Sequence, residues 1–182
     1  MATGHSTQSA PTGASIPVWA MSGDTRIFAP GESIPRRNAA RVLYLQAGIA
    51  TLSLRGGVIF DPAILLHPGD VIGALPLATN GDALARAATP CVVLSVDMGR
   101  LDAAARLSVM EHQQRVQARF TGALLNMLVL PAQTRVNDAH TAWAKATGAP
   151  CCPGPMLMSL AGVGRETASR LSALLKRQTR AG

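Results

Sequence analysis

The chain is poor in aromatic residues, which make up 3% of its 182 residues. Without aromatics to stack on bases, a platform for single-stranded nucleic acid is not expected. Apolar residues nevertheless reach 48% of the sequence, enough for a folded protein whose interior must be aliphatic. A length of 182 residues suits one or two small domains.

Cysteine is also scarce, with only Cys91, Cys151 and Cys152. An odd number of cysteines gives no complete disulfide set, and an adjacent pair flanked by prolines is poorly shaped to chelate zinc. An iron-sulfur cluster needs four thiolates, one more than the chain has. We expect reduced thiols in a cytoplasmic protein, with no metal and no cofactor.

Long apolar runs are missing as well. No segment approaches the roughly 20 apolar residues that cross a bilayer, because Asp61, Asn126 and several prolines interrupt the candidates. The first arginine is Arg26, so no basic leader precedes an apolar core. The sequence predicts no membrane partner.

Acidic residues are few in the second half of the chain. Residues 1–98 contain six Arg and six Asp or Glu, whereas residues 99–182 contain eleven Lys or Arg and four Asp or Glu. The net charge of +7 therefore lies entirely in the second half. Such asymmetry favours a polyanionic partner for that half, although a generally arginine-rich, soluble surface would give the same count.

The composition and apolar pattern of the sequence change three times along the chain. Residues 1–24 are rich in Ser, Thr, Gly, Ala and Pro without periodicity, which predicts a flexible tail. Residues 25–98 contain short apolar runs broken by glycine and proline, which is typical of an antiparallel β-roll. Residues 99–130 then read as one long helix, and residues 131–182 as a small helical domain.

The long helix has an apolar heptad seam. Its predicted positions are Val109, Val116, Phe120, Ala123, Met127 and Leu130, with Gln113 as the one polar member. We expect this seam to pair two copies of the chain, while Leu124, Leu125 and Leu128 pack on the chain's own domain. The alternative is a helix that packs its seam inside one chain.

The helical domain ends in a turn and a charged helix. Helices are expected over residues 132–147 and 156–161, followed by a turn through residues 162–164 and a helix from Arg165 to about Lys176. Helical spacing places Arg165, Glu166, Ser169 and Arg170 on one arc and apolar residues on the opposite face. Arginine can bind guanine O6 and N7 and glutamate can accept from cytosine N4, so this arc suits the major groove of DNA. A surface helix whose charges are merely solvated is the alternative.

These segments, in this order, resemble the Crp/Fnr family of bacterial transcription regulators (cyclic-AMP receptor protein and fumarate-nitrate regulator). The matching motifs are Phe28-Ala-Pro-Gly31-Glu32-Ser-Ile34, Leu43-Tyr44-Leu45-Gln-Ala-Gly48, His67-Pro68-Gly69-Asp70-Val-Ile72-Gly73, Arg135-Val136 to Trp143-Ala144-Lys145, and Gly162-Val-Gly-Arg165-Glu166-Thr-Ala-Ser-Arg170. The resemblance implies an α+β fold: a cyclic-nucleotide-binding-like jelly roll, a dimerisation helix and a C-terminal helix-turn-helix domain. Because the sequence stops at Gly182, we expect that domain to lack most of the family's two-stranded wing.

Site residues follow from the same resemblance. The DNA-binding set would be Arg165, Glu166, Ser169, Arg170, Lys176 and Arg177, the last two on phosphates. The effector pocket would involve Gly69, Asp70, Gly73 and Arg86. The implied partners are double-stranded DNA, a second copy of the chain, RNA polymerase and an unknown small-molecule effector.

The nucleotide pocket departs from the pattern of cyclic-AMP binders. Ala74 stands where those proteins have a glutamate for the ribose, and residues 80–86 lack the Arg-Ser or Arg-Thr pair that meets the cyclic phosphate. A buried phosphate needs such a positive partner, so the pocket is degenerate and cyclic AMP is not the expected effector.

Three other functions compete with a DNA-binding regulator. Haem would use His67, His112 or Cys91 as axial ligands. A metal-dependent cupin enzyme needs two or three histidines in the barrel, but His67 is the only one between residues 25 and 98. A degenerate relative would bind a ligand or partner through the β-roll and not bind DNA. We expect the chain not to be an enzyme.

Overall fold

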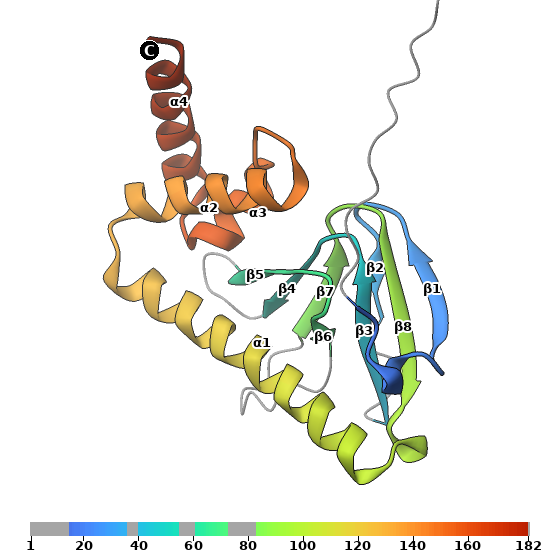
Figure 1. The fold of residues 1–182 in the computed structure, drawn as a ribbon. Coiled ribbons are helices and arrows are strands. Elements are labelled where there is room, and N and C mark those ends of the chain that lie inside the picture. Colours follow the sequence, from blue (N-terminus) through green and yellow to red (C-terminus); the bar gives the residue numbers. More distant parts are fainter. Residues whose placement is uncertain (1–14, 36–39, 55–60, 73–82, 182) are drawn as a thin grey trace, which may run out of the picture.

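The computed structural model describes residues 15–35, 40–54, 61–72 and 83–181, with the side chains of the last helix described as far as Leu175. In these ranges eight strands form two four-stranded antiparallel sheets. The first sheet has the order β1-β8-β3-β6 and consists of Asp24–Phe28, Cys91–Asp97, Arg41–Ala47 and Val71–Ile72. The second has the order β2-β7-β4-β5 and consists of Ser33–Ile34, Ala83–Ala87, Ala50–Leu54 and Ala63–Leu66. The β-roll expected from the sequence is confirmed (Figure 1).

Tight turns set the register of the roll. At Gly48, between β3 and β4, φ is +85°, and a Cβ atom there would lie 2.1 Å from the Pro90 carbonyl oxygen. Only glycine fits so close a backbone approach. The neighbouring pairing of β3 with β8 shifts register between Leu45 and Ala47, as expected at a β-bulge.

Four α-helices follow the sheets: α1 (Ala103–Val129), α2 (Ala132–Thr147), α3 (Gly154–Ala161) and α4 (Arg165–Ala181). Asp102 caps α1 by accepting a hydrogen bond from the Ala105 amide at 2.7 Å, and Pro131 separates α1 from α2. Helix α1 runs along the sheets, and α2, α3 and α4 gather beyond its C-terminal end (Figure 1). In the described part of the chain no helix has the length and apolarity that a bilayer crossing requires.

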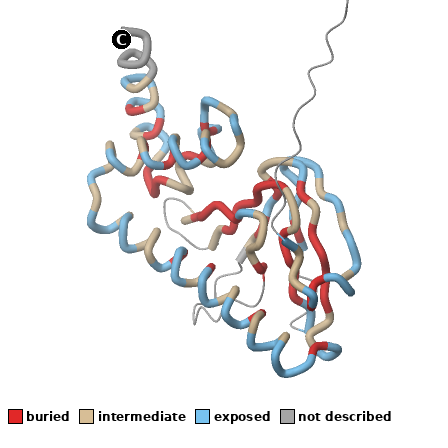
Figure 2. The backbone as a smooth tube through the Cα atoms, in the orientation of Figure 1, coloured by how far each residue is buried: buried red, intermediate tan, exposed pale blue. Residues whose placement is uncertain are grey.

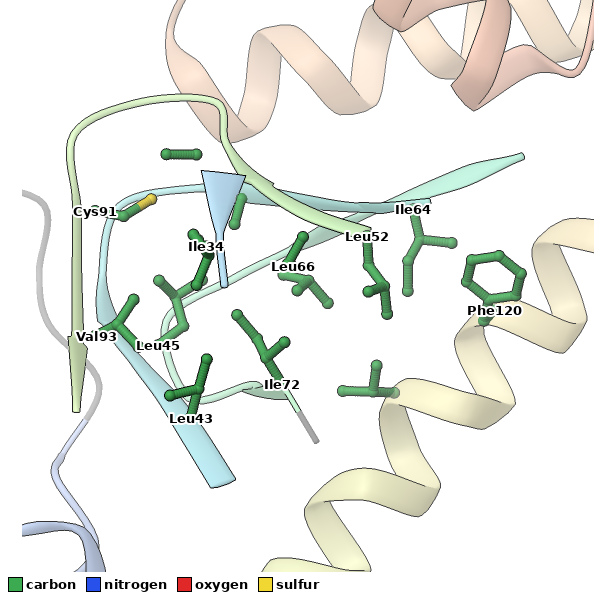
Figure 3. Close-up of a cluster of buried hydrophobic side chains, with 14 residues drawn as sticks. Ile34, Leu43, Leu45, Leu52, Ile64, Leu66, Ile72, Cys91, Val93 and Phe120 are labelled. Atoms are coloured by element: carbon green, nitrogen blue, oxygen red, sulfur yellow. The ribbon is translucent and has the colours of Figure 1, made fainter. Parts of the chain in front are cut away.

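An aliphatic core occupies the space between the two sheets and α1. It contains Leu45, Leu52 and Leu66 from the roll together with Val116 and Phe120 from α1. In Figure 3 the Phe120 ring points from α1 toward Leu52 and Ile64. Burial of this apolar surface holds α1 against the roll.

Part of the segment expected to be a flexible tail, residues 1–24, is ordered. Residues 1–14 lie outside the described ranges, but Val18–Ala20 form a 3-10 turn (η1) and Trp19 and Ala20 are buried. Trp19 packs edge-on against Tyr44 and His112, with ring centroids 5.6 and 6.1 Å apart. The prediction was wrong for this segment because composition alone gave no weight to one large apolar ring.

Candidate nucleic-acid interface

Helix α4 has a polar face and an apolar face, as its sequence predicts. Arg165, Glu166, Ser169 and Arg170 are exposed, whereas Ala168 and Leu171 are buried against α2 and α3. The four exposed residues line one shallow surface hollow of about 530 Å³. The four side chains therefore face one open surface.

Lys176 and Arg177 belong to the same helix by their backbone. Their side chains lie outside the described part of the structure, so their role on phosphates stays a prediction.

The turn before α4 depends on a glycine. Helix α3 ends at Gly162, whose backbone is left-handed with φ 60° and ψ 49°. A Cβ atom there would approach Met127 Cγ and Sδ to 2.7 Å, so the end of α1 lies directly against this turn. Gly162 thus fixes both the direction of α4 and its distance from α1.

Arg135, on α2, anchors the same turn. Its Nη1 donates hydrogen bonds to the carbonyl oxygens of Ala161 and Gly162, both at 2.7 Å. These carbonyls are at the C-terminal end of α3, where the helix dipole favours a positive charge. The sequence did not suggest this anchoring contact of Arg135, because its partners are 26 and 27 residues away.

The helical part shares a core with the β-roll. Ile49 and Leu65 of the roll are buried in one cluster with Val136, Trp143 and Leu157 of the helices. This contact fixes the position of α4 relative to the sheets.

The residues expected to form an effector pocket have other partners. Asp70 accepts two hydrogen bonds from the guanidinium of Arg119 on α1, at 3.0 and 2.8 Å, and one from the His67 amide at 2.7 Å. Gly69, with φ +98°, forms the turn between β5 and β6, and its amide donates to the Leu45 carbonyl. Arg86 is exposed and donates to the Gly31 carbonyl at 3.0 Å. The fourth residue, Gly73, lies outside the described ranges.

The hydrogen bonds of Asp70 and Arg86 therefore go to other parts of the chain, and the effector pocket stays a prediction. Asp70 ties a roll turn to α1, and Arg86 sits on β7 opposite Ser33. Both residues are expected in a pocket because the family resemblance places them there. Their partners, 49 and 55 residues away, are visible only in the fold.

The predicted dimer seam is wrong for its central residues. Val109, Val116 and Phe120 are at most 1% exposed, and they pack on the chain's own β-roll. Ala123 also packs on the roll core, and Met127 lies against Gly162. Leu130, half-buried, ends α1. The alternative of an intramolecular seam is the correct one for Val109, Val116 and Phe120.

The opposite side of α1 is the solvent-exposed side, drawn mostly pale blue in Figure 2. Its exposed positions follow helical spacing, and we call them the outer stripe: Leu107, Met110, Gln114, Ala118, Thr121, Leu125 and Leu128. Leu107 is 61% exposed and Leu128 is 82% exposed. Large apolar side chains repeated along one exposed helix face are unusual for a surface that meets only water. Leu125 and Leu128 were expected to pack on the chain's own domain, and their exposure contradicts that expectation, whereas Leu124 does pack on the roll core.

The residues considered for haem each have other contacts in the structure. The Cys91 thiol is buried in the roll core and donates to the Ile49 carbonyl at 3.1 Å, and burial raises the pKa of this thiol. Burial lowers the pKa of His67, an effect that Asp70 opposes and that Arg119 and Lys145 reinforce. His112 is packed against Trp19. Among the described residues no group of three or more His, Cys, Asp and Glu side chains is arranged to hold a metal ion.

Two antiparallel sheets, a long helix along them and three short helices define the architecture of the Crp/Fnr transcription regulators, and the chain has this fold. The resemblance seen in the sequence is thereby confirmed.

Solved structures of regulators superpose on most of the chain. TTHB099, a CRP-family regulator from Thermus thermophilus, gives a TM-score of 0.70 at 18% identity over 85% of each chain. The c-di-GMP responsive regulator CLP of Xanthomonas campestris gives 0.68 at 17% identity, covering 88% of this chain and 89% of CLP. FixK2 of Bradyrhizobium japonicum gives 0.61 at 19% identity over 86% of each chain. No protein-family model matches the chain, and no curated protein matches it by sequence.

Proposed function

We propose that the protein is a homodimeric, DNA-binding transcription regulator of the Crp/Fnr type, acting in the cytoplasm and without enzymatic activity. One observation carries the proposal: four exposed polar residues of α4 share one open surface above a buried apolar back. In this proposal α3, the Gly162 turn and α4 form a helix-turn-helix, and α4 enters the major groove.

The side chains divide into base readers and phosphate contacts. Arg165 and Arg170 present forked donors that match guanine O6 and N7, and Glu166 accepts from cytosine N4. Lys176 and Arg177 hold phosphates and set the affinity and its salt dependence. This assignment uses the exposure of Arg165, Glu166 and Arg170.

The proposed dimer forms through the outer stripe of α1 and not through the seam first expected. Leu107, Leu125 and Leu128 are large and exposed in the single chain, so a second copy can bury them. A twofold pair of α1 helices places the two α4 helices in successive major grooves, roughly 34 Å apart.

The proposed regulator does not depend on cyclic AMP. Asp70 is engaged by Arg119, and the space between the sheets and α1 contains aliphatic side chains. A cyclic phosphate would need a positive partner there to offset its desolvation. A small-molecule effector and contact with RNA polymerase stay part of the proposal.

Fluorescence anisotropy with labelled duplex DNA tests the proposal. The full chain is titrated first into random duplex DNA at low salt, and a cognate sequence is then selected from a random library. We expect Glu166→Ala to relax the preference at one base pair of each half-site by about 1–3 kcal/mol. Asp138→Ala, which removes an exposed carboxylate from α2, is the matched control and leaves the preference unchanged.

Two results would contradict the proposal. Equal loss of affinity by Glu166→Ala on cognate and scrambled duplexes would refute base reading by Glu166. No binding to any duplex, even at low salt, would favour the alternative of a β-roll binding protein that does not bind DNA.

A further inference from the structure

A second hollow adjoins the first on α4, where this helix meets the loop before α3. Its volume is about 840 Å³, within the usual range for small-molecule sites. The walls come from α4, from His140 on α2, from residues 151–159, and from Asp61 of the β-roll.

Much of the lining of the hollow is apolar. Pro155, Leu157 and Met158 line it from α3, and Ala168 and Ala173 line it from α4. An apolar lining favours a ligand with a ring or a branched hydrocarbon body, because such a body loses its contact with water there.

One wall carries a row of hydrogen-bond donors. Arg165, Ser169 and Ser172 all line the hollow, and their spacing of four and three residues places them on one face of α4. Within the described ranges, neither the Arg165 nor the Ser169 side chain has a hydrogen-bond or ion-pair partner.

The third donor is oriented by a histidine. The Cys152 amide donates to His140 Nδ1 at 3.4 Å. An accepting Nδ1 is consistent with the neutral imidazole that carries its proton on Nε2. Nε2 lies 3.2 Å from Ser172 Oγ. Ser172 then accepts from His140, and its own hydroxyl proton is left to donate into the hollow.

From this juxtaposition we infer that the hollow binds a small organic carboxylate with an apolar body. The carboxylate accepts from Arg165, Ser169 and Ser172, and the apolar body lies on Leu157 and Met158. Among the described residues that line the hollow, Asp61 is the one carboxylate.

Such a ligand would oppose DNA binding. Arg165 and Ser169 line both this hollow and the outer surface proposed to meet DNA. A guanidinium engaged by a carboxylate is less able to bind guanine. The small carboxylate therefore lowers the affinity for DNA, and DNA lowers the affinity for the carboxylate by the same factor. This consequence rests on the proposed function, whereas binding to the hollow does not.

Isothermal titration calorimetry of the full chain without DNA tests the site. The probes are 1-naphthylacetate and its neutral counterpart 2-(1-naphthyl)ethanol. We expect the acid to bind at least about tenfold more tightly than the alcohol, because only the acid can accept a charge-assisted bond from Arg165.

Two variants locate the binding. Ala173→Phe fills the hollow from an exposed position of α4 and should weaken 1-naphthylacetate at least about tenfold. Ala142→Phe makes the same change at an exposed position of α2 that is not among the lining residues. Its affinity for 1-naphthylacetate should stay within about twofold of the wild-type value. Circular dichroism of both variants verifies that they fold.

The inference is overturned if the acid gives no binding heat up to about ten millimolar, weaker than the usual scale of specific affinities. Equal affinity for acid and alcohol, or normal binding by folded Ala173→Phe, overturns it too. Anisotropy then adds the DNA arm: 1-naphthylacetate should weaken duplex binding by the wild-type chain and not by Ala173→Phe. If the acid does not bind but the chain binds DNA, only the proposed ligand site is refuted. If the acid binds but the chain does not bind DNA, only the regulator proposal is refuted.

Discussion

Substitutions at two residues of α1, Phe120 and Leu128, distinguish the side of the helix that packs on the roll from the outer stripe. Phe120 is 1% exposed and packs in the roll core, so Phe120→Ala leaves a cavity that the surrounding strands cannot fully close. We expect the free energy of unfolding to fall by about 3–5 kcal/mol, a large part of the stability of a small protein.

Leu128→Ala should leave the stability of a subunit nearly unchanged and weaken the proposed dimer. Leu128 is 82% exposed in the single chain, so its truncation should change the stability of an isolated subunit by at most about 0.5 kcal/mol. In the proposed dimer each copy loses about 1–2 kcal/mol of apolar burial. Two copies together then raise the dimer dissociation constant about thirtyfold to several hundredfold.

Urea unfolding at several protein concentrations and sedimentation equilibrium measure the two quantities. Several concentrations are needed because dimerisation itself stabilises the folded chain by mass action. The assignment of the two sides is refuted if Phe120→Ala dissociates the dimer without changing subunit stability while Leu128→Ala leaves the dimer intact. That result would restore the seam through Phe120.

Three further predictions concern the helical part. Gly148→Ala should lower the free energy of unfolding by about 1 kcal/mol, because alanine is strained in the left-handed backbone there. Gly162→Ala should lower it further, because its new Cβ also meets Met127. Urea unfolding of both variants measures the difference. Iodoacetamide at about pH 8, followed by mass spectrometry, should modify exposed Cys151 in the native protein and spare Cys152, whose pKa burial raises to about 12. The same pKa makes stability pH-dependent. Since the fold favours the neutral Cys152 thiol, the stabilisation is complete below the ordinary value of 9.0 and is lost as pH rises toward about 12. Cys152→Ala should flatten this alkaline decline in a pH series of unfolding curves.

The sequence predicts the order of the elements well, because turn residues and apolar periodicity are local signals. The expected helix over residues 132–147 coincides with α2, and the exposed arc of Arg165, Glu166, Ser169 and Arg170 lies where helical spacing puts it. Strand β7 (Ala83–Ala87) was not expected, since its alanines carry little β-propensity and pairing with β4 and β2 decides its structure.

The orientation of α1 could not be predicted from its pattern. Apolar residues occur on two sides of this helix, and a heptad count scores Val116 and Phe120 as readily as Leu125 and Leu128. Only the shape of the β-roll opening decides which side is buried, and that shape is set by strands far away in the sequence. The same holds for Asp70, whose partner Arg119 is 49 residues away.

Leu65 connects the three parts of the molecule. Its side chain is buried in the cluster that holds α2, α3 and α4, and its carbonyl accepts from Arg119 Nη2 on α1 at 3.0 Å. The same guanidinium holds Asp70 in the turn that follows β5, so this turn, α1 and the core behind α4 share one pair of residues. Because packed cores transmit displacement, a shift of the β5–β6 turn should reach both α1 and the helices that carry Arg165. If the proposed effector binds the roll, these contacts give its binding a physical route to the proposed DNA-reading face.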